Sequence, residues 1–333
     1  MLTHIRTSLY AQMMYPSASP LPHLFAALAD PTRLRVLALL RAMELSVGEI
    51  AQVLGQSQPR VSRHVKILAE AGLIERRKEG SWVFLGLGSG DLVEPVFGLI
   101  DRWKLRGGAD VWEADIERLQ AVRAERAAAA QSYFAAHAGD WDRLRSLHIA
   151  EAEVESAVAR ALADRPVGRL VDVGTGTGRM IELFGGVADR ALGIDRSPEM
   201  LRLARVKLAE AGLNAELRQG DMYALPMPAG AADTVILHQV LHYAQNPAAA
   251  VAEAGRLLAP GGRLLIADFA PHQREELRTR DAHARLGFAD DLVLRYLEQA
   301  GLEGEVVEHL EGGELTVTIW AGNRPDAILK EVA

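Results

Sequence analysis

Residues 171–178 read Val-Asp-Val-Gly-Thr-Gly-Thr-Gly, and this segment constrains the fold more than any other. An aliphatic run that begins at Leu170 ends in three glycines at alternating positions. The pattern predicts a buried strand that enters a tight turn, because glycine allows backbone conformations and close approaches that other residues do not. We call residues 174–178 the glycine turn, and we expect a nucleotide-type ligand beside it.

The residues after the glycine turn predict a parallel α/β sheet. Apolar strand segments alternate with helical segments, as in sheets joined by crossover helices. The expected strands are 170–173, 191–194, 215–219, 234–237 and 263–268, the last entered through the turn 260–262. Two further segments, 304–310 and 315–321, flank a pair of glycines and predict a final antiparallel hairpin.

Polar residues stand where the expected strands end, which is where ligands bind in such sheets. Asp195 follows Gly176 by nineteen residues, the spacing at which a carboxylate reaches ribose hydroxyls. Asp221 is placed to accept a hydrogen bond from an exocyclic amine, and Met222 to pack on a purine face. The predicted ligand-binding set is Asp172, Gly174, Thr175, Gly176, Gly178, Asp195, Met200, Asp221, Met222 and His238.

Two other ligand classes fit this turn less well. The dinucleotide fingerprint requires a third glycine one position later, where this chain has Arg179. The phosphate-binding loop requires Gly-Lys-Ser/Thr, which is absent. The spacing of the three glycines, with Asp195 and Asp221 after them, therefore favours a ligand that has an adenosine and no pyrophosphate.

These motifs carry a resemblance over residues 168–268. With 193–200, 241–243 and 258–262, they resemble class I S-adenosylmethionine-dependent methyltransferases, most closely the ubiquinone/menaquinone-biosynthesis-like group. The resemblance implies S-adenosylmethionine (SAM) or S-adenosylhomocysteine (SAH) as the ligand, and no metal. It places the glycine turn beside the methionyl part, Asp195 at the ribose and Asp221 and Met222 at the adenine, with Met200 a lesser contact or a core residue.

The first ninety residues differ in charge from the rest. They hold 10 Lys and Arg against 6 Asp and Glu, whereas the remaining residues hold 27 against 38. A basic front on an acidic body predicts that only the front meets a polyanion. The chain has no cysteine, which excludes disulfides and thiolate sites, and no apolar stretch approaches a membrane span, so a cytoplasmic location is expected.

Helix signals in this basic part predict a helix-turn-helix. Asp30 before Pro31 predicts one helix start, and Ser46 with Glu49 forms a capping-box pattern for the next. A third helix opens at Ser57, and a basic hairpin with a turn at 79–80 follows it. The predicted DNA-contacting residues are Ser57, Gln58, Arg60, Ser62, Arg63, His64 and Lys66 on that helix, and Arg76, Arg77 and Lys78 on the hairpin.

A second resemblance covers about residues 22–90. The runs 29–37 (Ala-Asp-Pro-Thr-Arg-Leu-Arg-Val-Leu), 58–68 and 70–74 resemble the ArsR/SmtB winged-helix regulators. The resemblance implies a repressor that binds a palindromic operator in double-stranded DNA as a homodimer. The family's metal-sensing cysteines are missing here, and residues 91–103 contain no His, so metal sensing by those routes is not expected.

The two resemblances together predict a multidomain chain. Its fold class is an N-terminal winged helix-turn-helix (α+β) and a C-terminal α/β Rossmann-like class I methyltransferase fold that ends in an antiparallel hairpin. An alanine-rich helix is expected over 111–137, and two aromatics that precede the sheet, Tyr133 and Trp141, either pack or close over the ligand. The predicted division is a flexible tail over 1–20, a DNA-binding and dimerisation domain over 21–105, a helical connector over 106–145, a SAM-binding domain over 146–325 and a tail over 326–333.

Three functions are compatible with these features. The chain is a transcriptional regulator with SAM or SAH as effector, an active small-molecule methyltransferase that regulates its own operon, or an enzyme whose front domain only dimerises. The fourth strand lacks the Asn/Asp-Pro-Pro-aromatic run of DNA adenine methyltransferases. His238 and His242 are candidates for a catalytic base, although histidines at such positions are more often structural. We expect the regulator.

Overall fold

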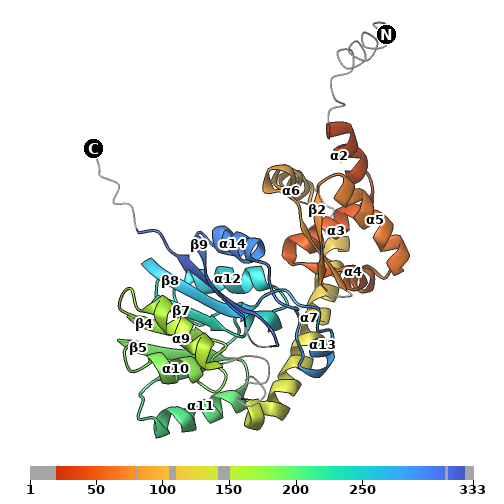
Figure 1. Cartoon of the computed structure of the whole chain (residues 1–333). Coiled ribbons are helices and arrows are strands. Elements are labelled where there is room, and N and C mark those ends of the chain that lie inside the picture. The colour runs from red at the N-terminus through yellow and green to blue at the C-terminus, as the bar shows by residue number, and fades with distance from the viewer. Residues whose placement is uncertain (1–19, 80–81, 105–109, 142–150, 312–313, 327–333) are drawn as a thin grey trace, which may run out of the picture. The chain divides into compact units, whose positions relative to one another are not determined.

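The computed structural model describes residues 20–79, 82–104, 110–141, 151–311 and 314–326 (Figure 1). The chain divides into two compact units, and the boundary falls inside helix α7, after Val122. Apart from Pro20 and Asp326, the two predicted tails lie outside the described residues, as do both borders of the predicted connector.

The first unit is a helix-turn-helix with a small three-stranded sheet. Its sheet has the order β1-β3-β2, in which the central β3 hydrogen-bonds to both neighbours. The strands are β1 (Leu45–Ser46), β2 (Ile74–Glu79) and β3 (Trp82–Leu87). The helices are α2 (Pro20–Leu28), α3 (Pro31–Ala42), α4 (Val47–Leu54), α5 (Gln58–Glu70), α6 (Gly90–Lys104) and the first part of α7 (Asp110–His137).

The predicted helix caps are confirmed. The Asp30 carboxylate accepts hydrogen bonds from the backbone amides of Thr32 and Arg33, at 2.8 and 3.1 Å. Ser46 and Glu49 form the reciprocal capping box of α4, which satisfies two amides that the first helical turn leaves unpaired. Gly55 ends α4 at φ +64°, where a side chain would be strained. The α4–α5 pair is therefore defined by local signals.

Helices α6 and α7 complete the core of the first unit. Phe97 in α6 and Leu119 in α7 belong to the same buried cluster as Val36 in α3, Ile50 in α4 and Val65 in α5. The first half of α7 is thus a structural element of this unit, because it fills the core that the helix-turn-helix leaves open.

The second unit is built on a seven-stranded sheet of order β6-β5-β4-β7-β8-β10-β9. The first five strands are parallel, and β10 runs antiparallel to both β8 and β9, so the expected mixed sheet and final hairpin are confirmed. The strands are β4 (Arg169–Val173), β5 (Arg190–Asp195), β6 (Glu216–Gln219), β7 (Ala232–His238), β8 (Leu258–Phe269), β9 (Glu303–Leu310) and β10 (Val317–Asn323).

One strand differs from the sequence expectation. The turn predicted at 260–262 is an irregularity inside β8, because the register with β7 jumps from Ala232–Leu258 to Thr234–Arg263. Extra residues in one strand of a pair bend it without ending the pairing. The strand therefore begins at Leu258 and not at Arg263.

Helices cover both faces of this sheet. One face packs on α12 and α14, and the other on α9, α10 and α11. These helices are α9 (Glu151–Leu162), α10 (Arg179–Phe184), α11 (Pro198–Glu210), α12 (Pro247–Arg256) and α14 (Asp290–Gln299), joined by the short η1 (Ala138–Asp140), η2 (Leu241–Tyr243) and α13 (Glu276–Arg280).

The strand order reverses at the centre of the sheet. From β4 the chain proceeds to β5 and β6 on one side, and then to β7 and β8 on the other. The crevice at such a switch point, beyond the carboxyl ends of the strands, is where ligands bind in this class of sheet. Within the described residues, no helix combines the length and apolar character needed to cross a membrane.

Candidate functional site

The glycine turn has the backbone geometry that only glycine adopts easily. Gly174, Gly176 and Gly178 have φ values of +73°, +54° and +86°. A Cβ on Gly174 would lie 2.3 Å from the Val240 side chain, so no larger residue fits there. The turn is tied to β5, since the amides of Gly174 and Thr175 both donate to the Ile194 carbonyl, at 2.7 and 3.0 Å.

Asp172 is held in place beneath this turn. Its side chain is buried, and the Thr175 hydroxyl donates to its Oδ2 at 2.6 Å. A buried carboxylate needs such partners, because removing its charge from water is otherwise costly. The predicted residues Asp172 and Thr175 therefore form a hydrogen-bonded pair at the end of β4.

Asp195 connects the turn to the end of β5. Its Oδ2 accepts the Gly176 amide at 2.9 Å, and its Oδ1 accepts the Ser197 amide at 2.8 Å. Burial raises the pKa of Asp195, against the lowering effect of these backbone hydrogen bonds. Each carboxylate oxygen can accept a further hydrogen bond, so the side chain remains suited to ribose hydroxyls.

The third strand brings Asp221 to the same edge. The Gly220 amide donates to the Asp195 carbonyl at 3.0 Å, which joins the two strand ends. The Asp221 side chain accepts the Tyr223 amide at 3.0 Å and shapes the turn after β6. Met222 is half-buried against the core of the unit.

Two members of the predicted set have different surroundings. Met200 is buried in α11, and its amide donates to the Ser197 hydroxyl at 3.2 Å. His238 is half-buried at the carboxyl end of β7. A ligand contact by either residue remains a prediction.

A buried histidine–aspartate pair lies beside the same strand ends. His242 Nδ1 is 2.7 Å from Asp268 Oδ1, and both side chains are buried. Asp268 Oδ2 also accepts the backbone amides of Leu241 and His242, at 2.9 and 3.2 Å. His242 Nε2 has no hydrogen-bond partner among the described residues. The sequence provided His242 as a candidate base but did not indicate its pairing with Asp268.

Aromatic side chains gather at the glycine turn. The rings of Phe134 and Trp141 have centroids 5.3 Å apart, and Tyr243 lies 4.8 Å from Phe134 and 6.2 Å from Trp141. Trp141 reaches the turn itself, since a Cβ on Gly176 would be 3.5 Å from its Nε1. The sequence pointed to Tyr133 and Trp141, but not to Phe134 or Tyr243, for which it carries no local signal.

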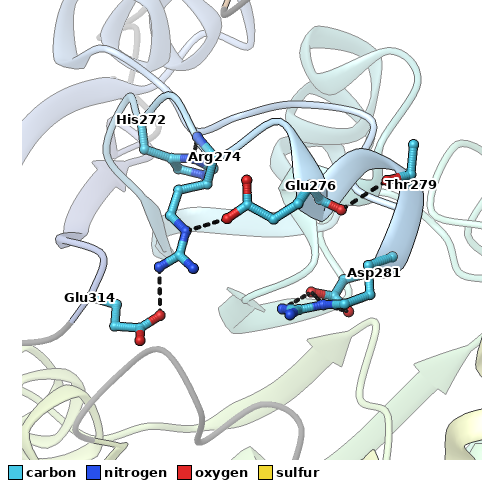
Figure 2. Close-up of polar contacts among 7 residues, drawn as sticks. His272, Arg274, Glu276, Thr279, Asp281 and Glu314 are labelled. Carbon is cyan, nitrogen blue, oxygen red and sulfur yellow. Dashed lines mark hydrogen bonds and ion pairs between the residues drawn. The ribbon is translucent and has the colours of Figure 1, made fainter.

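Charged and histidine side chains lie in the segment after β8. Figure 2 shows the Arg274 guanidinium between Glu276 and Glu314. Its Nε donates to Glu276 Oε1 at 2.6 Å, and its Nη1 donates to Glu314 Oε2 at 2.5 Å. His272 Nδ1 accepts the Arg274 amide at 3.3 Å. Burial, together with His242 and nearby arginines, lowers the pKa of His272 to about 4, so this ring is neutral at pH 7.

The predicted DNA-contacting helix is α5, and its polar side is open. Its apolar side is buried through Val61, Val65 and Leu68. The exposed residues are Ser57, Gln58, Arg60, Ser62, Arg63 and Lys66. Ser57 begins the helix, but its side chain makes no capping hydrogen bond.

Three of the predicted contacts on α5 and the hairpin have protein partners. His64 is half-buried, with its Nδ1 3.6 Å from Asp30 Oδ1, and Lys66 lies 3.7 Å from Glu70. Arg77 is half-buried in an ion pair with Glu44, at 2.8 Å. Arg76 and Lys78 flank it on β2 and are exposed. Within the described ranges, no group of three or more acidic or histidine side chains is arranged to hold a metal ion.

Comparison with known families agrees with both halves of this description. The family described as "Helix-turn-helix domain" matches residues 28–77, and the family described as "Methyltransferase domain" matches residues 171–266. The structure of the YcgJ protein from Bacillus subtilis aligns with a TM-score of 0.46 and 17% identity, over 52% of this chain and 98% of its own.

Curated relatives match one half of the chain or the other. The arsenical resistance operon repressor of Escherichia coli is 37% identical over 30% of this chain and 78% of its own length. The ubiquinone biosynthesis O-methyltransferase of Thiobacillus denitrificans is 30% identical over 44% of this chain and 70% of its own. The demethylmenaquinone methyltransferase of Thermus thermophilus is 38% identical over 34% of this chain. The matched segment spans about half (53%) of that enzyme's length.

Proposed function

We propose that this chain, which belongs to the ArsR-type helix-turn-helix proteins through its first unit and to the methyltransferases through its second, is a transcriptional regulator. In this proposal the first unit binds operator DNA as a homodimer and represses transcription. The second unit binds SAM or SAH as the effector. The proposal predicts that ligand occupancy changes operator affinity, which requires the ligand to bind the DNA-competent and incompetent states unequally.

The exposed side of α5 supports the DNA-binding part. Arg60 and Arg63 are exposed on one helix, as are Ser62 and Gln58, and arginine with amide and hydroxyl side chains suits phosphates and base edges in a major groove. Arg76 and Lys78 add exposed positive charge on β2. The acidic character of the rest of the chain makes this concentration of basic residues distinctive.

The glycine turn supports the ligand-binding part. A Cβ on Gly174 would collide with Val240, whereas one on Gly176 would make ordinary contact with Trp141. The absence of side chains on both glycines lets a ligand approach the backbone of the turn. Asp195 would hold the ribose, Asp221 and Met222 the adenine, and the buried Asp172 lies where an ammonium group of the methionyl part would find a carboxylate. When bound, SAM supplies a methyl group on a sulfonium centre, and SAH supplies the same scaffold without it.

The observation that carries the proposal is that helix α7 belongs to both units. In the first unit, its Leu119 fills the core and its Asp115 pairs with Arg35 of α3. In the second unit, its final turn carries Phe134, and Trp141 follows shortly after, beside Gly176. A ligand that reorders these aromatic rings would act on the helix that also buttresses the DNA-binding unit.

The test is a titration of both ligands against DNA binding. The full chain is mixed with a fluorescent duplex of the promoter upstream of its own gene, and anisotropy reports Kd at rising SAM or SAH. At least one ligand is expected to change Kd by about 5-fold to 150-fold, the usual range of allosteric coupling. The Gly174→Ala variant is the control, and it should bind DNA without responding to ligand. An operator Kd that stays constant at saturating levels of both ligands would refute the proposal.

The buried His242–Asp268 pair favours a second candidate function, an active small-molecule methyltransferase. Asp268 fixes the imidazole through Nδ1 and leaves Nε2 as the acceptor for a proton. A hydroxyl or amine acceptor would form its new bond to the methyl carbon as the S–CH3 bond breaks, and its proton would pass to His242 Nε2. Such general-base assistance contributes about 10²- to 10⁴-fold to a rate.

Labelled-methyl transfer separates this candidate from pure regulation. Labelled SAM is incubated with the full chain and a metabolite extract, and His242→Gln is compared with His309→Gln, a change at an exposed histidine. The candidate predicts a labelled product that only His242→Gln abolishes. Tight SAM binding without turnover across a broad acceptor screen would count against it.

A further inference from the structure

Three half-buried aromatic rings form a wall at the glycine turn. Phe134 stands near the end of α7, Trp141 follows η1, and Tyr243 lies in η2. Phe134 meets the other two edge-to-face, with interplanar angles of 71° and 80°. Each ring keeps part of its surface exposed, so the cluster is not an enclosed piece of core. We call these three residues the ring wall.

The ring wall stands against the backbone that would hold the methionyl part of the ligand. Trp141 Nε1 and Cδ1 lie 3.5 and 3.9 Å from the position of a Cβ on Gly176. The loop that carries Tyr243 also crosses Gly174, through Val240. Trp141 and Val240 therefore pack directly against the glycine turn.

The electrostatic surroundings of the ring wall favour a cation. Burial is the largest cause that raises the pKa of Tyr243 well above its ordinary value, and Tyr133 and the carboxylates of Asp268 and Asp281 act in the same direction. The Tyr243 ring is already flanked by His242 and His283, with ring centroids 4.0 and 5.3 Å away, so the half-buried Trp141 is the ring best placed to meet a cation from outside the protein.

We propose that Phe134, Trp141 and Tyr243 recognise the sulfonium cation of SAM, and that the second unit consequently prefers SAM to SAH. The two ligands differ by one methyl group and one positive charge on sulfur, and aromatic faces attract a cation but not a neutral thioether. This inference rests on the proposed function, and it identifies SAM as the form that the site selects. Trp141 contributes most, because indole is the strongest of the three rings for cations.

Isothermal titration of the full chain with SAM, SAH and sinefungin tests the inference. Sinefungin carries an amine-bearing carbon, also cationic, where SAM carries the sulfonium. The wild-type chain should bind SAM and sinefungin more tightly than SAH. Trp141→Leu should raise the Kd of SAM by about 2-fold to 30-fold, the range expected for exposed to desolvated cation–π contacts. It should change the Kd of SAH by less than about 2-fold. Phe134→Leu should act in the same direction, and Trp141→Phe should give an intermediate SAM/SAH ratio.

Each result has a separate meaning. Phe25→Leu removes an exposed ring from α2 and should change the affinity for neither SAM nor SAH. The SAH affinity of each variant reports whether the site has kept its shape, and thermal unfolding reports whether the chain has folded. If Trp141→Leu weakens the binding of SAM and SAH equally, or leaves the ratio of their Kd values unchanged, the inference is overturned and the ring wall is a packing feature. A wild-type chain that binds none of the three ligands would instead overturn the proposed function.

Discussion

Arg35 in α3 and Asp115 in α7 form a bidentate ion pair, with 2.5 Å between Nε and Oδ2 and 2.7 Å between Nη2 and Oδ1. Arg118 adds a second guanidinium to Asp115 Oδ1 at 2.7 Å. Burial opposes ionisation, but these two arginines lower the pKa of Asp115. The carboxylate is therefore charged at pH 7 and ties α7 to the helix before the helix-turn-helix.

Removal of the Asp115 carboxylate should destabilise the first unit. Asp115→Ala leaves Arg35 without its partner at a largely buried site, and breaking a buried pair in this way costs about 3 kcal/mol. Urea unfolding of the full chain measures the change. Asp101→Ala is the matched control, because Asp101 also pairs with an arginine, Arg41, but both side chains are about half exposed. It should cost less than about 1 kcal/mol. Equal costs for the two variants would contradict the structural role of the Asp115 pair.

Exposed arginines on α5 should determine the salt dependence of DNA binding. Arg60→Ala and Arg63→Ala each remove one cation from the proposed DNA-facing side. A lost phosphate contact reduces the slope of log Kd against log salt by about one, whereas a lost base contact relaxes sequence preference instead. Anisotropy titrations between about 50 and 200 mM salt give the slope.

The control for these two variants is an exposed arginine in the other unit. Arg205→Ala in α11 changes net charge by the same amount. It should leave the slope and the affinity unchanged. If Arg205→Ala weakens binding as much as Arg60→Ala and Arg63→Ala together, the interaction is a general charge effect and α5 is not the recognition helix.

Gly174 should be far less tolerant of alanine than Gly212. Both have positive φ, +73° and +69°, so alanine incurs similar backbone strain of about 1–2 kcal/mol at each. Only Gly174 adds a collision, at 2.3 Å from Val240, whereas a Cβ on Gly212 meets nothing within 4 Å. Gly174→Ala should therefore cost more stability and abolish SAM and SAH binding, while Gly212→Ala keeps both ligands. Calorimetry and urea unfolding of the two variants decide this, and SAM binding by Gly174→Ala at wild-type affinity would show that the turn is not the ligand cradle.

Local features of this chain could be predicted from its sequence, and long-range pairings could not. The caps at Asp30 and Ser46 depend on residues within three positions, and the strand end at Asp195 follows from the apolar run before it. The parallel strands and the final antiparallel hairpin of the second unit agree with the predicted alternation of helices and strands.

The unpredicted contacts join residues far apart in the chain. Eighty positions separate Arg35 from Asp115, and the ring wall brings Tyr243 onto Phe134 from more than a hundred positions away. No periodicity marks such pairs, because they depend on how completed helices pack. Arg77 illustrates the same limit: its charge indicated DNA, but its position beside Glu44 was not visible in the sequence.

The neutral state of His272 makes the stability of the second unit depend on pH. Its folded pKa is about 4, against an ordinary value of 6.5. Between these values the unfolded chain binds a proton that the folded chain excludes, so stability falls as pH decreases from about 6.5 towards 4 and is fully retained above 6.5. At pH 5 the loss of stability should be about 2 kcal/mol.

The His272→Asn variant should remove most of this pH-dependent loss, because the asparagine side-chain oxygen can replace Nδ1 as acceptor for the Arg274 amide. Urea unfolding at pH 7.5 and 5.0 measures the difference, with His309→Asn at an exposed site as the control. A pH dependence identical in wild type and His272→Asn would assign the acid sensitivity to other groups, since the excluded proton would then not be the one on His272.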